Sequence, residues 1–153
     1  MLQFENPLNS TSYAFPVLEC LHIVGFAFSI GTIAIVDLRL LDIALLHQTP
    51  AQLNKDMSGG TLAGLTSMVL TGLLLYSSDP DMYYLNYAFL VKIFFLLLAI
   101  VFNYTYHRKV VNGGGPPGSS KMAAYVSLVL WSLVCFGGIF IGFLNPTLDI
   151  NKI

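Results

Sequence analysis

The chain has 153 residues, of which 56% are hydrophobic and only 10% are charged. A soluble globular domain carries about 25% charged residues, so the composition excludes that class. The formal net charge of −1 excludes the basic surface with which a protein binds nucleic acid. Apolar runs close to 20 residues long predict instead helices that cross a lipid bilayer.

The first predicted helix covers about residues 15–46. Pro16 suits the first turn of a helix, and Ser12 upstream can cap it. At 1.5 Å per residue the segment would reach about 45 Å, which exceeds the ~30 Å of hydrocarbon in a bilayer. Its C-terminal part is therefore expected to project into the membrane interface, and Pro50 follows as a stop signal.

Three further crossings are predicted at about residues 58–77, 83–107 and 122–144. Residues 112–120, with the sequence NGGGPPGSS, form a flexible connector because glycine and proline do not support a helix. The other two loops are short, so neighbouring helices should be antiparallel. We therefore predict a single all-α membrane domain over residues 1–153, with four transmembrane helices in an up-and-down bundle.

Basic residues mark one side of the predicted bundle. Five cations lie in or near the loops after the first and third helices: Arg39, Lys55, Arg108, Lys109 and Lys121. The opposite side holds only Lys152, together with Asp79 and Asp81. Because cytoplasmic loops are rich in Lys and Arg, we expect a multi-pass protein of the inner (cytoplasmic) membrane with both termini on the periplasmic side.

Glycine pairs predict close helix packing. Gly60 and Gly64 form one GxxxG pair, and Gly138 and Gly142 form another. Small residues let helices approach closely in lipid. Packing within the bundle is the simplest interpretation, but the same faces would also allow contact with other membrane subunits or with a second copy of the chain.

Three ionisable side chains fall in the predicted outer leaflet. Glu19 and His22 are three residues apart on one helical face, and Lys92 enters from the same side on the third helix. Such groups are costly in lipid and often functional, so they predict a cofactor-binding cluster for proton exchange, a quinone head group, or a metal or haem held by His22. The simpler alternative is structural: Lys92 extends to the interface and Glu19 is solvated there. If the cluster forms, Lys92 should pair with Glu19.

A second polar group is predicted near the cytoplasmic end. Asp37, Arg39 and Asp42 lie at the end of the first predicted helix, and Asn103 on the third helix approaches the same depth. Arg39 and Asp42 are three residues apart and can pair. We expect a structural polar clamp between helices, and the alternative is a proton or ligand site facing the cytoplasm.

The three histidines bear on a possible haem site. Four-helix cytochromes hold haem b between two histidines at matched depth on facing helices. His22 is predicted on the outer side, whereas His47 and His107 both fall at the inner rim. Haem b bound by the inner pair is therefore an alternative rather than the expectation, and the sequence assigns no metal, because it contains no CxxC, HExxH or P-loop pattern.

Three segments resemble a group of small bacterial four-helix membrane proteins without a settled activity: LHIVGFAFSIGTIAIVDLRLLD, TGLLLYSSDP and LVKIFFLLLAIVFNYTYH. The resemblance covers most of the chain and implies that His22, Asp37, Arg39, Lys92 and Asn103 are family positions. The chain is more loosely similar to copper-resistance-protein-D-like membrane domains, whose helices also open with a histidine and a glycine spacing. It is much shorter than those domains and lacks their additional helices.

The expected function is that of a non-catalytic subunit or accessory protein of a larger membrane complex, respiratory or electron-transferring. The small size and the glycine-lined helix faces favour this interpretation. One alternative is a redox module that binds haem b or quinone through the Glu19, His22 and Lys92 cluster. A second alternative is a small metal or proton-coupled transporter.

Overall fold

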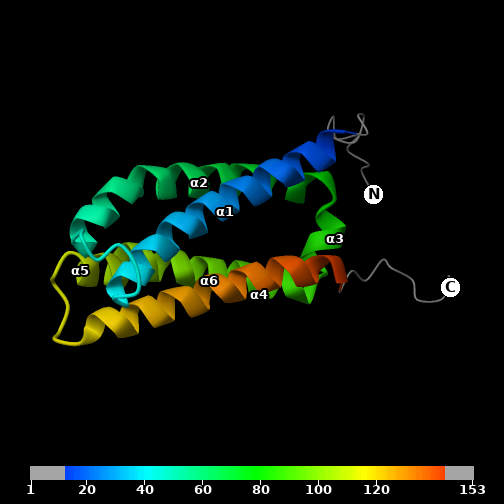
Figure 1. Cartoon of the computed structure of the whole chain (residues 1–153). Coiled ribbons are helices and arrows are strands. Elements are labelled where there is room, and N and C mark those ends of the chain that lie inside the picture. Colours follow the sequence, from blue (N-terminus) through cyan, green and yellow to red (C-terminus); the bar gives the residue numbers. More distant parts are fainter. Residues whose placement is uncertain (1–12, 144–153) are drawn as a thin grey trace.

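The computed structural model describes residues 13–143, apart from the side chains of residues 81 and 82. Two long helices open this part of the chain, α1 (Ala14–Leu40) and α2 (Pro50–Ser78). They run antiparallel and lie against each other over most of their length (Figure 1).

The second half of the described chain is built in the same way. The short α3 (Pro80–Tyr84) leads into α4 (Tyr87–Phe102), which continues through a π-helical segment (Asn103–His107) into α5 (Arg108–Val111). After a loop, α6 (Ser119–Phe143) returns antiparallel to α4 (Figure 1).

Four helical segments are long and apolar enough to cross a membrane: Ala14–Leu40, Pro50–Ser78, Tyr87–Val111 and Ser119–Phe143. The third of them consists of α4, the π-helical segment and α5. The described residues contain no strand. The predicted fold class, an all-α bundle of four transmembrane helices, is therefore confirmed.

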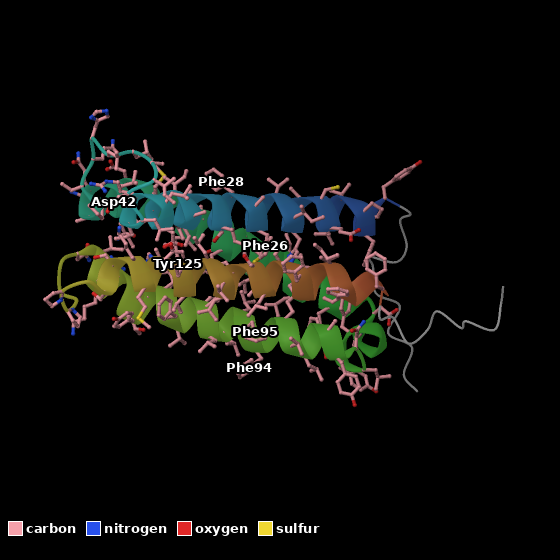
Figure 2. All side chains as sticks on the ribbon, turned by 60° about the horizontal axis from the view of Figure 1, so that its bottom comes forward. Phe26, Phe28, Asp42, Phe94, Phe95 and Tyr125 are labelled. Atoms are coloured by element: carbon pink, nitrogen blue, oxygen red, sulfur yellow. The ribbon has the colours of Figure 1, made fainter. Side chains whose placement is uncertain are left out.

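The bundle consists of two helix pairs. α1 packs mainly on α2 and α4 packs mainly on α6, while contacts between α1 and α6 join the pairs. Figure 2 labels Phe28 on α1 and Phe94 on α4, which are exposed on the outer surface, whereas Phe26 and Phe95 pack against the core. The buried residues of the central core cluster are Ile33, Leu65, Met68, Ala99, Leu130, Trp131 and Val134.

The first helix ends before the predicted residue 46 because the chain turns sharply after it. Asp42 and Leu45 have positive φ angles of 59° and 54°, a left-handed conformation that does not continue an α-helix. Arg39 holds the turn, since its Nε donates a hydrogen bond to the carbonyl oxygen of Gln48 at 2.6 Å. The segment predicted to project as a helix into the interface is therefore mostly a loop.

The second helix begins at Pro50, well before the predicted residue 58. Thr49 caps it, because its hydroxyl oxygen accepts a hydrogen bond from the backbone N–H of Gln52 at 3.2 Å. Pro50 occupies the first helical position, where its missing N–H costs nothing. The added turns are polar, and an apolar run therefore marks only the lipid-spanning part of this helix.

The start of α4 is fixed by one buried side chain. Asn86 precedes the helix, and its Oδ1 accepts a hydrogen bond from the N–H of Ala88 at 2.9 Å. Its Nδ2 donates to the carbonyl oxygen of Ile141 on α6, also at 2.9 Å. Asn86 thus caps α4 and ties it to α6, and the helix begins at Tyr87 rather than at residue 83.

Glycines set the spacing of α1 and α2. A Cβ atom added to Gly64 would lie 2.8 Å from both the carbonyl oxygen of Gly25 and the backbone nitrogen of Ser29. A Cβ on Gly60 would lie 3.2 Å from the ring of Phe28. The Gly60 and Gly64 pair therefore packs inside the bundle, where small residues let the two backbones touch.

Candidate functional site

His22 lies half-buried between α1 and α2, in the half of the bundle where α1 begins. Its Nδ1 is 3.1 Å from Oγ1 of Thr71 on α2. Gly72 makes room for the ring, because a Cβ there would lie 3.0 Å from Cε1 of His22. The charge of Lys92 acts on this imidazole, so the structure brings His22 and Lys92 into one region.

The side chain of Lys92 packs against two adjacent glycines of α6. A Cβ on Gly137 would lie 3.0 Å from Cβ of Lys92, and a Cβ on Gly138 would lie 3.4 Å from its Nζ. The two glycines therefore admit the lysine stem between α4 and α6. Gly138, predicted as half of a helix-packing pair, has this role, whereas a Cβ on Gly142 would meet nothing within 4 Å.

Within residues 13–143, Glu19 does not form the ion pair with Lys92 that the predicted cluster would contain. It is exposed. Burial raises the pKa of the Tyr83 hydroxyl on α3, and the carboxylates of Glu19 and Asp79 raise it further. Glu19 thus lies near the α2–α3 corner.

A double-mutant cycle tests this arrangement. Because Glu19 and Lys92 form no ion pair, the effects of Glu19→Gln and Lys92→Met on the free energy of unfolding in detergent should add to within about 0.5 kcal/mol. Thermal unfolding of the two single variants and the double variant measures the coupling. A coupling energy above about 1 kcal/mol would show that the two side chains interact directly.

The strongest polar contact of the described chain lies at the opposite end. Nε2 of His107 is 2.6 Å from Oδ1 of Asp37, and the two side chains are 2% and 0% exposed. The contact joins α1 to the π-helical segment that follows α4, and the two residues are 70 positions apart in the sequence. Either the imidazole N–H donates to a carboxylate or a carboxyl O–H donates to the imidazole nitrogen, and the two states differ only in where one proton resides.

Asp37 has a second neighbour on α6. Ser127 faces its carboxyl group, but neither Oδ2 of Asp37 nor Oγ of Ser127 has a hydrogen-bond partner of good geometry among the described residues. Buried polar atoms without partners are uncommon and are frequently associated with functional sites. The carboxyl group therefore has one oxygen held by His107 and one still able to accept a proton or a hydrogen bond.

The π-helical segment presents His107 to this site. A π-helical turn inserts an extra residue into an α-helix and rotates the residues that follow, and such insertions occur frequently at functional sites. Asn103 and His107 are the first and last residues of the segment, and both line the same cavity. The deviation from α-helix is thus located where the buried pair forms.

A small polar cavity adjoins the pair. It has a volume of about 40 Å³ and lies between α1, α2 and the π-helical segment. One wall is apolar, from Ile33 and Val36, whereas the others are polar. The polar lining residues are Asn54, Ser58, Thr61, Asn103, Tyr104, His107 and Arg108. A water molecule needs about 10–15 Å³ of such volume, so the cavity has room for a few waters or one small ion.

The structure divides the predicted polar clamp into two parts. Arg39 and Asp42 pair with each other at 3.0 Å, with side-chain exposures of 16% and 59%, and thus form a surface contact at the loop end labelled in Figure 2. Asp37 pairs instead with His107, and Asn103 lines the cavity. Sequence reasoning placed His107 at the rim and missed its contact with Asp37.

The predicted haem ligands at the inner rim have different surroundings. His47 is exposed in the loop between α1 and α2, whereas Nε2 of the buried His107 is engaged by Asp37. Within residues 13–143 no group of three or more His, Cys, Asp or Glu side chains could hold a metal ion. No observation on the described chain supports haem b, which the sequence left as an alternative.

Comparison with known proteins adds one relationship. No curated protein and no solved structure matches the chain, and nothing links it to copper-resistance protein D. The model of a family of unknown function, DUF6644, matches residues 11–144 and thus nearly the whole sequence. The chain therefore belongs to the DUF6644 family.

Proposed function

We propose that this protein is a small proton-coupled transporter of the inner membrane, in which Asp37 and His107 form the proton-exchanging site. The observation that carries the proposal is the contact between these two side chains, 2.6 Å long and almost completely buried. Ionisable groups inside a membrane bundle commonly mark proton relays and ion pathways.

The pair has the chemistry that proton exchange requires. A carboxyl group and an imidazole in contact can hold a proton between them, and a second proton converts the pair from a net neutral to a positive state. The neighbouring cavity of about 40 Å³ has room for water, through which protons can reach His107. Organic ligands occupy pockets of about 300 Å³ or more, so the cavity favours protons and small ions over haem or quinone.

The charge distribution supports an orientation with the cavity toward the cytoplasm. The end of the bundle that carries the cavity also carries Arg39, Lys55, Arg108, Lys109 and Lys121. α1 begins and α6 ends at the opposite end (Figure 1). By the positive-inside rule, both termini then face the periplasm and the pair exchanges protons with the cytoplasm.

Proton counting tests the proposal. The protein in lipid nanodiscs is titrated between about pH 8 and pH 5, the range in which histidines change charge. The wild type should bind one proton more than the double variant Asp37→Asn with His107→Gln, because that variant keeps no titratable group at the pair. The control is Asp42→Asn, which removes an exposed carboxyl and should match the wild type. Equal proton counts for the wild type and this double variant would refute the proposal.

The predicted accessory subunit is a second candidate. Three glycines that have no neighbour from another helix favour it, since a Cβ on Gly31, Gly59 or Gly142 would meet nothing within 4 Å. Another membrane helix can approach closely at such positions. This role predicts that the chain co-purifies in mild detergent with a fixed set of other membrane proteins, and that Gly31→Leu or Gly59→Leu releases them without unfolding the bundle.

A further inference from the structure

The cavity beside His107 has an unbalanced charge. Of its lining residues, Arg108 is cationic and His107 can become cationic, whereas no carboxylate lines the cavity. Asp37 is adjacent, but its Oδ1 is engaged by His107 and the carboxyl group is faced by Ser127 on α6. A cation in the cavity would therefore meet like charge, while an anion would meet opposite charge.

The cavity also has hydrogen-bond donors without partners. His107 uses Nε2 toward Asp37, and its Nδ1 makes no hydrogen bond to another described residue. The side-chain amides of Asn54 and Asn103 likewise have no hydrogen bond within residues 13–143, and both residues line the cavity. Nδ1 of His107 carries a hydrogen when the imidazole is protonated or when the Asp37 carboxyl O–H donates to Nε2. This N–H, two amide groups and a guanidinium are together the donor types that bind anions.

Size restricts the ligand further. A volume of about 40 Å³ holds only a few water molecules, at about 10–15 Å³ for each. Such a space suits a monatomic or triatomic anion and excludes a phosphate ester, a dicarboxylate or a lipid head group.

We infer that the cavity formed by Asn54, Asn103, His107 and Arg108 binds a small monovalent anion of the size of chloride or formate. The inference rests on the proposed function, because it names the class of solute that would be coupled to the proton on the Asp37–His107 pair. An anion and a proton that move together carry no net charge across the membrane.

Anion-dependent stability tests this inference with chloride and formate as probes. The full-length protein in detergent is unfolded thermally in sodium chloride, sodium formate and sodium gluconate at equal ionic strength. A ligand that binds only the folded state raises Tm, and a shift of about 2–4 °C over gluconate is expected for the two small anions. The absence of a shift would overturn the inference.

Two neighbouring cations give a matched comparison. Arg108→Gln should lose the shift, whereas Lys109→Gln should keep it, because Lys109 is exposed and does not line the cavity. Equal shifts in both variants would overturn the inference, since the anions would then act on the surface as a whole. If Arg108→Gln does not fold, broadening of the chloride NMR signal by the wild type, reversed by formate, supports the site, and unchanged line width overturns it.

The result separates this inference from the proposed function. If the anions produce no shift while the wild type still binds one proton more than the double variant Asp37→Asn with His107→Gln, only the anion site is refuted. If the proton difference is also missing, both are refuted.

Discussion

Replacing His107 with alanine should lower the free energy of unfolding in detergent by about 3–5 kcal/mol, because the substitution leaves a buried carboxyl group without its partner. Asp37 is 0% exposed and lies 2.6 Å from the imidazole, so in the folded wild type its carboxyl group depends on His107 rather than on bulk water. Asp37→Ala should have a comparable effect. Thermal or denaturant unfolding monitored by circular dichroism measures both.

The double variant shows whether the two side chains act as a unit. When both partners are removed, no unpaired polar group remains, so Asp37→Ala combined with His107→Ala should cost about 2 kcal/mol less than the sum of the single variants. The matched control is the exposed pair of Arg39 and Asp42, for which Asp42→Ala should cost at most about 1 kcal/mol. Additive effects at Asp37 and His107 would contradict the buried contact.

Gly64→Ala should destabilise the bundle by about 1–3 kcal/mol, the usual range for an overpacked interior. Its new Cβ would lie 2.8 Å from the backbone of both Gly25 and Ser29, and backbone atoms cannot move aside as a flexible side chain can. α1 and α2 would have to separate along their whole contact. The measurement is again unfolding in detergent, with retention of helical signal as a check on folding.

A second glycine of the same helix provides the control. A Cβ on Gly59 would meet nothing within 4 Å, so Gly59→Ala should stabilise the protein by up to about 1 kcal/mol through the higher helix propensity of alanine. The two substitutions are chemically identical and lie on one helix. If Gly59→Ala and Gly64→Ala had the same effect, the close α1–α2 contact would not exist in the membrane protein.

The four spanning helices could be predicted from the sequence because a bilayer demands long apolar runs. Their ends could not be predicted as well. Residues 41–46 are mostly apolar and contain neither glycine nor proline, so they read as a continuation of the first helix. The chain nevertheless turns there, because Asp42 and Leu45 take the left-handed conformation. Tertiary contacts such as that of Arg39 with Gln48, rather than local propensity, fix this turn.

Only part of the candidate site could be predicted from the sequence. Asp37 stands out as a charge next to an apolar run, and Asn103 was the expected partner at matching depth. His107 reaches that position through a π-helical segment, which no periodicity rule based on 3.6 residues per turn anticipates. The available signal was a histidine at the end of the third span, one turn beyond Asn103 and at the same end of the bundle as Asp37.

The proposed proton exchange between Asp37 and His107 can be tested most directly by infrared difference spectroscopy. Acidification of the protein in lipid should convert one buried carboxylate to a carboxylic acid, seen as the gain of a C=O band with loss of a carboxylate band. Both bands should be missing in Asp37→Asn, shifted in His107→Ala and unchanged in Asp42→Asn. Difference spectra of the wild type and Asp37→Asn that superimpose would contradict the account.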